Sequence, residues 1–223
     1  MAFHLDLNRL KRPPSTGIFP KQKSIMLNFW KNLLTKGPLI EIGTTSHKIR
    51  DDFIGLNLEY YDYVNIIADA HYLPFKDNSI AGIHIDAVLE HVKDPFSISK
   101  EIYRVLKKEG GLVAWAPFIA SYHKSPEDYY RFTLSGIRKV FSDFKEYKVI
   151  AGPGGFSALS EILRNCFAIM CSFKNELLFK LFCIFWGWIF QPIKYLDIIF
   201  SYSRDLSLPS HSTAAGFLYM GRK

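Results

Sequence analysis

The chain has 223 residues, 48% of them hydrophobic, and a formal net charge of +7 at pH 7. This length suits one domain with additions and allows a sizeable buried core, and the composition excludes an intrinsically disordered protein. Three cysteines without a C-x-x-C pair argue against a disulfide framework and favour a reduced, cytoplasmic protein. The first residues lack the apolar stretch that is typical of a secretory signal peptide.

The first 36 residues are strongly basic, with seven lysines and arginines against one acidic residue, Asp6. Such an arm can attract phosphates, nucleic acid or anionic lipid, or it can be a solvated extension, and both interpretations remain open. Residues 1–23 are rich in proline and are expected to be extended. Ser24 is expected to cap a helix that Gly37 ends.

Short apolar segments alternate with helical patterns over residues 37–151. Asp94 is predicted to cap one helix, and Thr133 another. The Gly110-Gly111 pair is expected to turn the chain into the next strand. The segments predicted to be strands are residues 39–43, 64–68, 80–85, 112–116, 147–150 and 215–220. This alternation predicts an α/β fold with a parallel, doubly wound sheet, which binds its ligand where the strands end.

Three sequence motifs in the middle of the chain resemble those of a known protein family. Residues 69–79 place an acidic residue before a Leu-Pro-Phe turn, residues 89–95 read Leu-Glu-His-Val-Lys-Asp-Pro, and residues 101–111 end in Gly-Gly. In this order they resemble the class I S-adenosylmethionine-dependent methyltransferases of the type 11 family. The resemblance covers about residues 39–141 and implies a Rossmann-like, mostly parallel sheet of seven strands with an antiparallel seventh. It also implies S-adenosyl-L-methionine as the cofactor.

The resemblance assigns the first part of the cofactor site to the ends of two strands. Glu41 and Gly43 stand at the family's acidic and glycine-rich positions, where a missing side chain lets the backbone approach the cofactor. Asn57 stands where the family has an acidic residue for the ribose hydroxyls, and an amide accepts these hydrogen bonds more weakly. The single glycine excludes a dinucleotide site of the G-x-G-x-x-G type.

Asp69 and Ala70 match the family pattern more closely. The resemblance implies that the Asp69 carboxylate accepts from the adenine amino group, while the backbone beside it, at Ala70, binds the ring. Asp86 ends the next predicted strand, where a negative group would favour a cationic sulfur. His91 is a further candidate for this site, or it packs on the following helix.

Residues 117–133 follow the predicted fifth strand and resemble a subgroup of the same family. A histidine suits the proton transfer that a hydroxyl acceptor needs, so His123 is predicted as the general base and Asp128 as its orienting partner. Tyr130 and Arg131 are predicted to bind the acceptor. The alternative is that Asp128, Tyr130 and Arg131 hold the loop on the core. No metal ligands are predicted.

The segment 176–200 is apolar on all faces but is interrupted by charged residues and a proline. Three interpretations remain open: a helical cover over the substrate site, a helix in a membrane interface with Trp186 and Trp188 at headgroup level, or a dimer contact. The predicted divisions of the chain are residues 1–36 (basic arm and helix), 37–151 (cofactor-binding core), 152–210 (helical apolar insertion) and 211–223 (final strand).

These observations predict an S-adenosylmethionine-dependent methyltransferase that acts on a small-molecule, glycan or lipid-linked acceptor. The alternative is a methyltransferase-like protein without catalysis that serves as a scaffold or a peripheral-membrane subunit. A cytoplasmic location is expected, with attachment to the inner face of the membrane as an option. No nucleic-acid partner is expected, because the basic arm lacks interleaved aromatic residues.

Overall fold

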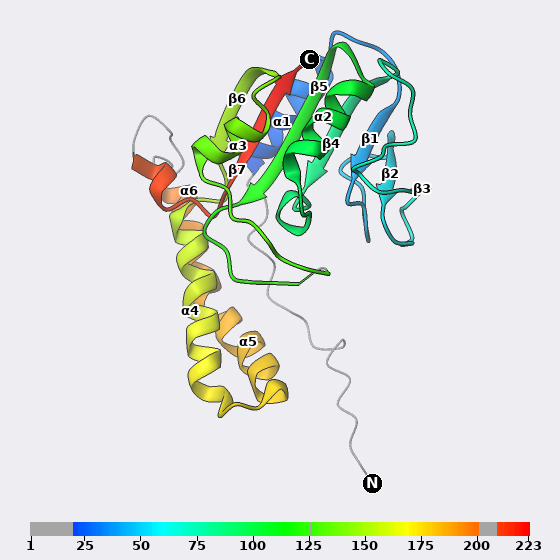
Figure 1. The fold of residues 1–223 in the computed structure, drawn as a ribbon. Coiled ribbons are helices and arrows are strands. Elements are labelled where there is room, and N and C mark those ends of the chain that lie inside the picture. The colour runs from blue at the N-terminus through cyan, green and yellow to red at the C-terminus, as the bar shows by residue number, and fades with distance from the viewer. Residues whose placement is uncertain (1–19, 125, 201–208) are drawn as a thin grey trace.

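The computed structural model describes residues 20–124, 126–200 and 209–223 (Figure 1). Most of the predicted basic arm therefore lies outside the described residues. The predicted helix is present as α1 (Pro20–Lys31), which begins earlier than expected, so that Ser24 lies within it rather than at its cap.

Seven strands form a single mixed sheet in the order β3-β2-β1-β4-β5-β7-β6. The strands β1 to β5 run parallel, and β7 is antiparallel to both of its neighbours. This arrangement confirms the predicted α/β fold and its inserted final strand. The strands are β1 (Leu39–Ile42), β2 (Phe53–Asn57), β3 (Ile66–Ile67), β4 (Ile80–Asp86), β5 (Leu106–Pro117), β6 (Lys145–Ala151) and β7 (Gly216–Arg222).

Helices cover both faces of the sheet. Because side chains of a strand alternate between faces, β5 contributes Leu112 and Ala114 to one core and Val113 to the other. The first core is covered by α2 (Pro95–Val105) and α3 (Leu134–Val140), and the second by α1. The chain is thus doubly wound, as the alternation of segments predicted.

Local capping signals place the two helices of the first face. The Asp94 carboxylate accepts from the backbone N–H groups of Phe96 and Ser97, at 3.0 and 3.2 Å. The Thr133 hydroxyl accepts from the Gly136 N–H at 3.0 Å. Both predicted caps are therefore present, and each satisfies donors that the first turn of a helix leaves without a partner.

Two segments near the strands are irregular. The bounds of β5 include Gly110 and Gly111, but its pairing with β4 shifts between Leu106, which pairs with Ile80, and Gly111, which pairs with Gly82, so the chain bends before the regular part of the strand. Residues 43–52, between β1 and β2, form a loop without helix. The loop that follows β1 is therefore held by side-chain hydrogen bonds, which belong to the site described below.

The apolar segment forms a helical hairpin. Because β5 and β6 are both antiparallel to β7, they run parallel to each other, and the chain leaves β6 at the edge where β1, β4 and β5 also end. There α4 (Gly155–Ser172) begins and, with α5 (Glu176–Phe190), projects away from the sheet (Figure 1). The short helices η3 (Gln191–Tyr195) and α6 (Leu196–Ile199) lead back toward the sheet.

Polar contacts fix the base of this hairpin. The buried Asp197 carboxylate accepts from the Ser157 N–H and hydroxyl, at 2.9 and 2.7 Å, and the Ser160 hydroxyl donates to the Phe190 carbonyl at 2.9 Å. The stretch Glu176–Ile199 is long and apolar enough to cross a membrane by length and composition only, which is weak evidence by itself. Only 11% of its most apolar window is buried.

Candidate functional site

The predicted cofactor residues gather where the order of the parallel strands reverses, between β1 and β4. Gly43 follows β1 with a φ of +89°, and a side chain there would meet Val88 at 2.3 Å. A residue with a Cβ is excluded at this position on both grounds. Gly43 thus lets the loop after β1 approach the segment after β4 closely, which is the position at which such sheets bind ligands.

Glu41 lies in β1 and is buried. Its Oε2 accepts from the Ile49 N–H at 2.8 Å, so the carboxylate supports the loop that follows Gly43. Burial raises the pKa of Glu41, and the nearby Asp86 charge adds to this, while the hydrogen bond from Ile49 opposes it. The side chain that is predicted to contact the cofactor therefore also has a structural role.

Asn57 ends β2 and has both halves of its amide engaged. Its Nδ2 donates to the Thr44 carbonyl at 2.8 Å, and its Oδ1 accepts from the Leu58 N–H at 2.7 Å. A carboxylate could not make the first of these contacts, because it has no hydrogen to donate. The amide thus ties the loop after β1 to the end of β2, which gives a physical reason for the departure from the family's acidic residue.

Asp69 lies just beyond β3 and keeps about half of its side chain exposed, at 48%. Its Oδ1 accepts from the His71 N–H at 2.9 Å and lies 2.7 Å from His71 Nδ1. Partial burial raises the pKa of Asp69, but the contacts with His71 outweigh it, and the net pKa is lowered. The carboxylate is therefore ionised at neutral pH and retains exposed surface, while the neighbouring Ala70 is buried.

Asp86 is the last residue of β4 and keeps some exposed surface, although much protein surrounds its carboxyl group. Desolvation by the surrounding protein raises its pKa to about 6, an effect that His47 partly opposes. The predicted cofactor needs an acceptor for an adenine amino group, close backbone approach, and a negative group near a cationic sulfur. Asp69, Gly43 and Asp86 supply these from the ends of three parallel strands, so the residues present fit the group. The ribose position, with its engaged Asn57, fits less well.

The predicted acceptor loop is held together by an ion pair. Arg131 donates to both oxygens of Asp128, at 2.5 and 2.6 Å, and also to the carbonyls of Ala120 and Ser121. The hydrogen bonds from Arg131 lower the pKa of Asp128 to about 2. The Tyr130 hydroxyl donates to the Lys93 carbonyl at 2.8 Å. These contacts match the alternative in which the three side chains hold the loop on the core.

His123 is oriented by the backbone rather than by Asp128. Its Nδ1 lies 3.0 Å from the Ser121 carbonyl oxygen and 3.7 Å from Asp128 Oδ2. Asp128 instead accepts from the His123 backbone N–H at 2.7 Å. Because a carbonyl only accepts, we assign the proton to Nδ1, which leaves the Nε2 lone pair of a neutral His123 unprotonated.

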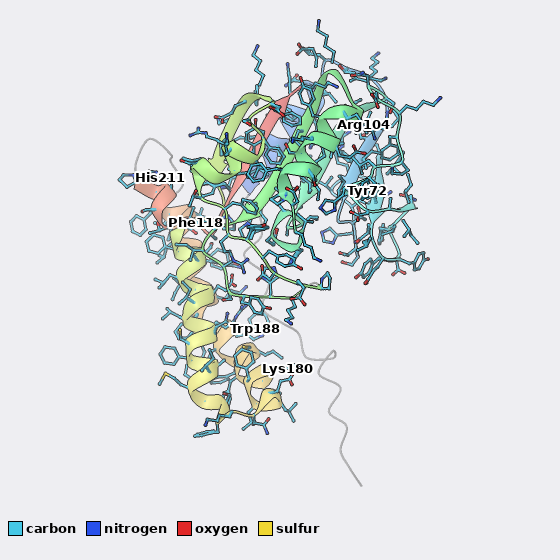
Figure 2. All side chains as sticks on the ribbon, in the orientation of Figure 1. Tyr72, Arg104, Phe118, Lys180, Trp188 and His211 are labelled. Atoms are coloured by element: carbon cyan, nitrogen blue, oxygen red, sulfur yellow. The ribbon has the colours of Figure 1, made fainter. Side chains whose placement is uncertain are left out.

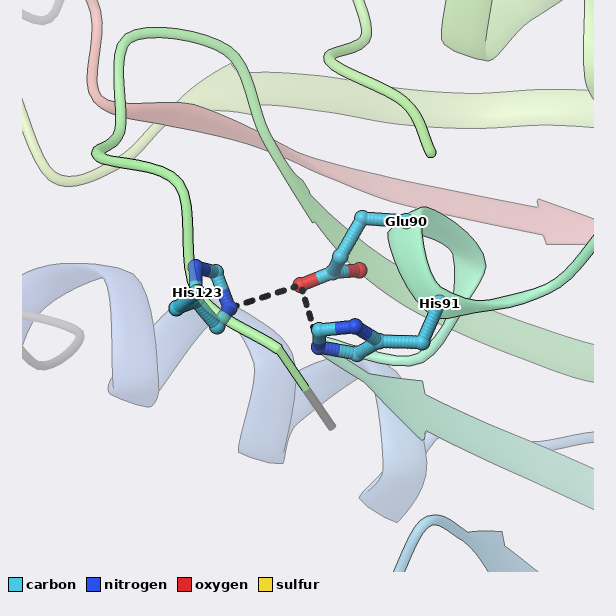
Figure 3. Close-up of side chains that lie close together, drawn as sticks. All are labelled: Glu90, His91 and His123. Carbon is cyan, nitrogen blue, oxygen red and sulfur yellow. Dashed lines mark ion pairs between the residues drawn. The ribbon is translucent and has the colours of Figure 1, made fainter. Parts of the chain in front are cut away.

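The Nε2 atom of His123 faces Glu90, a residue that was not among the predicted site residues (Figure 3). Glu90 Oε1 lies 3.9 Å from His123 Nε2 and 3.8 Å from His91 Nε2. The Glu90 side chain is fully buried, and within the described part of the chain neither of its oxygens has a hydrogen-bond partner. Burial raises the pKa of Glu90 to about 7, and the Asp86 and Asp128 charges add to it. The only signal in the sequence was an acidic residue beside His91.

Comparisons with known proteins concern the domain and the fold. Residues 45–114 match a protein family described as a methyltransferase domain. No curated protein matches the chain.

Solved structures share the fold at low identity. A Galdieria sulphuraria protein described as a candidate sarcosine dimethylglycine methyltransferase is 14% identical, with a TM-score of 0.55 over 91% of this chain and 84% of that one. Phosphoethanolamine N-methyltransferase 2 of Haemonchus contortus, solved with S-adenosyl-L-methionine, is 15% identical, with a TM-score of 0.52 over 90% of this chain and 52% of that one. The cyclase SpnF is 12% identical, with a TM-score of 0.52 over 96% and 88%. These likenesses concern the fold alone.

Proposed function

Because the chain carries a class I S-adenosylmethionine-dependent methyltransferase domain of the type 11 family, we propose that it methylates a small-molecule, glycan or lipid-linked acceptor. The observation that carries the proposal is a convergence at one edge of the sheet. Gly43, Asp69 and Asp86 lie at the ends of parallel strands, and the loop that carries His123 follows the adjacent strand β5.

Each part of this edge has a proposed role. S-adenosyl-L-methionine supplies a methyl group on a sulfonium, and its transfer to the acceptor leaves S-adenosylhomocysteine and releases the acceptor's proton. Asp69 and Ala70 hold the adenine, Gly43 admits the methionine portion, and Asp86 faces the sulfonium. The acceptor loop orients the acceptor, and its proton is lost at the cluster that contains His123. Positioning and proton removal are the contributions such a transfer needs from a protein.

A scaffold without catalysis remains the second candidate, and Asn57 is the observation that favours it. The residue at the ribose position is committed to Thr44 and Leu58, and replacing a charged acceptor costs on the order of 1 kcal/mol of binding free energy. The likeness to SpnF, whose described activity is that of a cyclase, illustrates that this fold does not dictate methyl transfer.

Calorimetric titration with S-adenosylmethionine and S-adenosylhomocysteine tests the proposal. We expect micromolar binding of both ligands, lost in Asp69→Ala and kept in Asp62→Ala, a matched change of an exposed aspartate between β2 and β3. If neither ligand binds to folded protein, the methyltransferase proposal is wrong and the scaffold takes its place.

We further propose that the α4–α5 hairpin docks on an anionic membrane surface. Large apolar side chains are exposed near the turn between the helices, with Phe173 83% and Met170 71% accessible. Lys174 and Lys180 lie in the same region, and Figure 2 shows Lys180 and Trp188 on the hairpin, away from the sheet. Exposed apolar and aromatic residues bordered by lysines suit a bilayer interface.

The hairpin also touches the acceptor loop, which supports a lipid-linked acceptor. Glu161 of α4 accepts from the Ser121 N–H at 3.1 Å, and Asn165 donates to the Ser121 hydroxyl. Ser121 in turn accepts from His123 Nδ1 and Arg131. A hairpin seated on a membrane would therefore present the acceptor loop close to the lipid surface.

Co-sedimentation with phosphatidylglycerol-containing vesicles tests the docking. We expect the protein to bind and the double variant Met170→Ser/Phe173→Ser to bind several-fold more weakly. Tyr72→Ser is the matched control, because Tyr72 is 80% exposed but lies on the sheet domain (Figure 2). Absence of binding, or an equal loss in the control, would contradict the docking and leave the cover or a dimer contact.

A further inference from the structure

We infer that Glu90, His91 and His123 form a binding site for a divalent transition-metal ion. Their ligand atoms all lie within 4.8 Å of one another, although the residues come from η2 (Leu89–His91) and from the acceptor loop (Figure 3). The sequence predicted no metal, since His123 follows the adjacent Glu90 and His91 only 32 residues after His91, which is no familiar ligand spacing.

Both imidazoles are oriented as metal ligands are. His91 Nδ1 lies 2.5 Å from the Glu127 carbonyl oxygen, and His123 Nδ1 lies 3.0 Å from that of Ser121. Because carbonyl oxygens only accept, the proton of each neutral ring belongs on Nδ1, and each Nε2 presents a lone pair. A hydrogen bond from the distant nitrogen to a carbonyl is the usual way in which proteins fix a metal-binding histidine.

The third ligand is a buried carboxylate without a hydrogen-bond partner among the described residues. Such groups are rare in proteins, because an unpartnered buried carboxylate is strongly disfavoured. Oε1 of Glu90 faces the two Nε2 atoms at 3.8 and 3.9 Å, which is too long for hydrogen bonds. Ligand atoms about 2.1 Å from a tetrahedral zinc ion would lie about 3.4 Å apart, so small side-chain rotations would close the site.

The backbone around the cluster holds its two halves together. The Tyr129 N–H donates to the Glu90 carbonyl at 2.7 Å, and Asp128 accepts from the His123 N–H at 2.7 Å. The ligands are thus positioned without an ion, which reduces the conformational entropy that binding would cost. The Asp128–Arg131 pair thus has a positioning role, in line with the alternative in which these side chains hold the loop.

The site is open on one side. The His123 side chain is 48% exposed, whereas those of His91 and Glu90 are 11% and 0% exposed. Two histidines and one carboxylate with a free coordination position are typical of reactive rather than structural zinc sites. Resting on the proposed function, we assign the free position to an oxygen of the acceptor, whose proton an adjacent cation makes easier to lose. His123 then acts as a ligand, and the proton passes to solvent.

Metal analysis of the full chain tests the site without requiring methyl transfer. After chelator treatment, we expect about one equivalent of Zn²⁺ to bind, and Co²⁺ to give the visible absorption of a low-coordinate nitrogen and oxygen site. Glu90→Gln and His123→Ala should each weaken binding at least about tenfold, as losing one of three ligands implies. His211→Ala is the control, because His211 lies in η5 (Pro209–Ser212) and does not belong to the cluster.

His123 is partly exposed, so His123→Ala is the variant that should keep its fold even if Glu90→Gln does not. Binding well below one equivalent, or binding that folded His123→Ala retains, would overturn the inference. The cofactor titration is independent of this result: metal binding without S-adenosylmethionine binding would preserve the site and refute the proposed function. Cofactor binding without metal binding would support the proposed function and refute the metal site.

Discussion

The sheet domain and the α4–α5 hairpin are both rich in apolar residues, but they use them differently. In β4, every residue except Asp86 is buried. In α5, which has 15 residues, only Gly187 is buried, although the helix is made almost entirely of aliphatic and aromatic residues. Hydrophobic composition therefore does not indicate burial by itself.

The difference lies in what each region packs against. The strand β4 lies between β1 and β5, with a packed core on each face of the sheet, whereas α5 packs mainly on α4, through contacts such as Phe167 with Trp186 at 4.9 Å between ring centroids. Much of the hairpin's apolar surface is left accessible. An apolar surface of this kind is typical of a docking site rather than of a folding core.

The largest loss of stability should come from truncating a buried side chain in the sheet. Ile85 is fully buried in β4, and Ile85→Ala should cost about 3 kcal/mol of unfolding free energy through lost burial and the cavity left behind. Chemical denaturation followed by circular dichroism measures this. Ile189→Ala makes the same deletion in α5, where the side chain is 46% exposed, and should cost much less. Equal costs would mean that the hairpin is buried in solution.

The second prediction concerns the joint between the two regions. Asp197→Ala removes the carboxylate that accepts from the Ser157 N–H and hydroxyl, and leaving these buried donors unpaired should cost about 2 kcal/mol. We expect the hairpin to become sensitive to limited proteolysis while the sheet stays resistant. Asp197→Asn keeps the shape and one acceptor, and should be intermediate. Uniform loss of protease resistance would show that the two regions unfold together.

The sheet could be predicted from the sequence because its signals are local. Asp94 and Thr133 predicted where two helices begin, and runs of apolar residues predicted the strands. The failure at Ser24 has a local cause as well, because this serine resembled a cap but lies inside α1. A side chain that can cap does not do so when the helix extends past it.

The site was only partly predictable, because its contacts join distant segments. The positions of Gly43, Asp69 and Asp86 followed from the family pattern and the strand ends. The commitment of Asn57 to Thr44, and of Arg131 to Asp128, could not be read from residue types. Glu90 passed unnoticed because a glutamate in a short helical turn is ordinarily solvated, and only the folded chain reveals its burial.

Acid should weaken the sheet through His84, a buried histidine in β4. Burial lowers its pKa to about 4, and neither ring nitrogen has a hydrogen-bond partner among the residues described. As pH falls below the unfolded value near 6.5, the unfolded chain takes up a proton that the folded chain refuses. This histidine's contribution to stability is therefore complete above about pH 6.5 and is lost progressively toward pH 4.

Between pH 7.5 and 5.5 the loss attributable to this histidine should be about 1 kcal/mol. Comparing the two pH values in His84→Leu isolates it, because the other titrating groups remain. The variant should show a smaller decrease than the parent protein in denaturant titrations. An unchanged pH dependence would mean that His84 takes up its proton in the folded state.

The smallest predicted effect on stability is a gain rather than a loss, and it concerns the tip of the hairpin. Phe173 directly follows α4, has a φ of +48° and is 83% exposed, so a bulky side chain adopts a left-handed conformation without gaining burial. Phe173→Gly should therefore stabilise the lipid-free protein, by about 0.5 kcal/mol, since glycine is the favoured residue at such a helix end. The same variant should bind anionic vesicles less well.

A residue that lowers stability and serves docking is expected where function, rather than folding, selects the side chain. Destabilisation of more than about 1 kcal/mol would instead show that Phe173 is buried in solution, in a cover or a dimer contact.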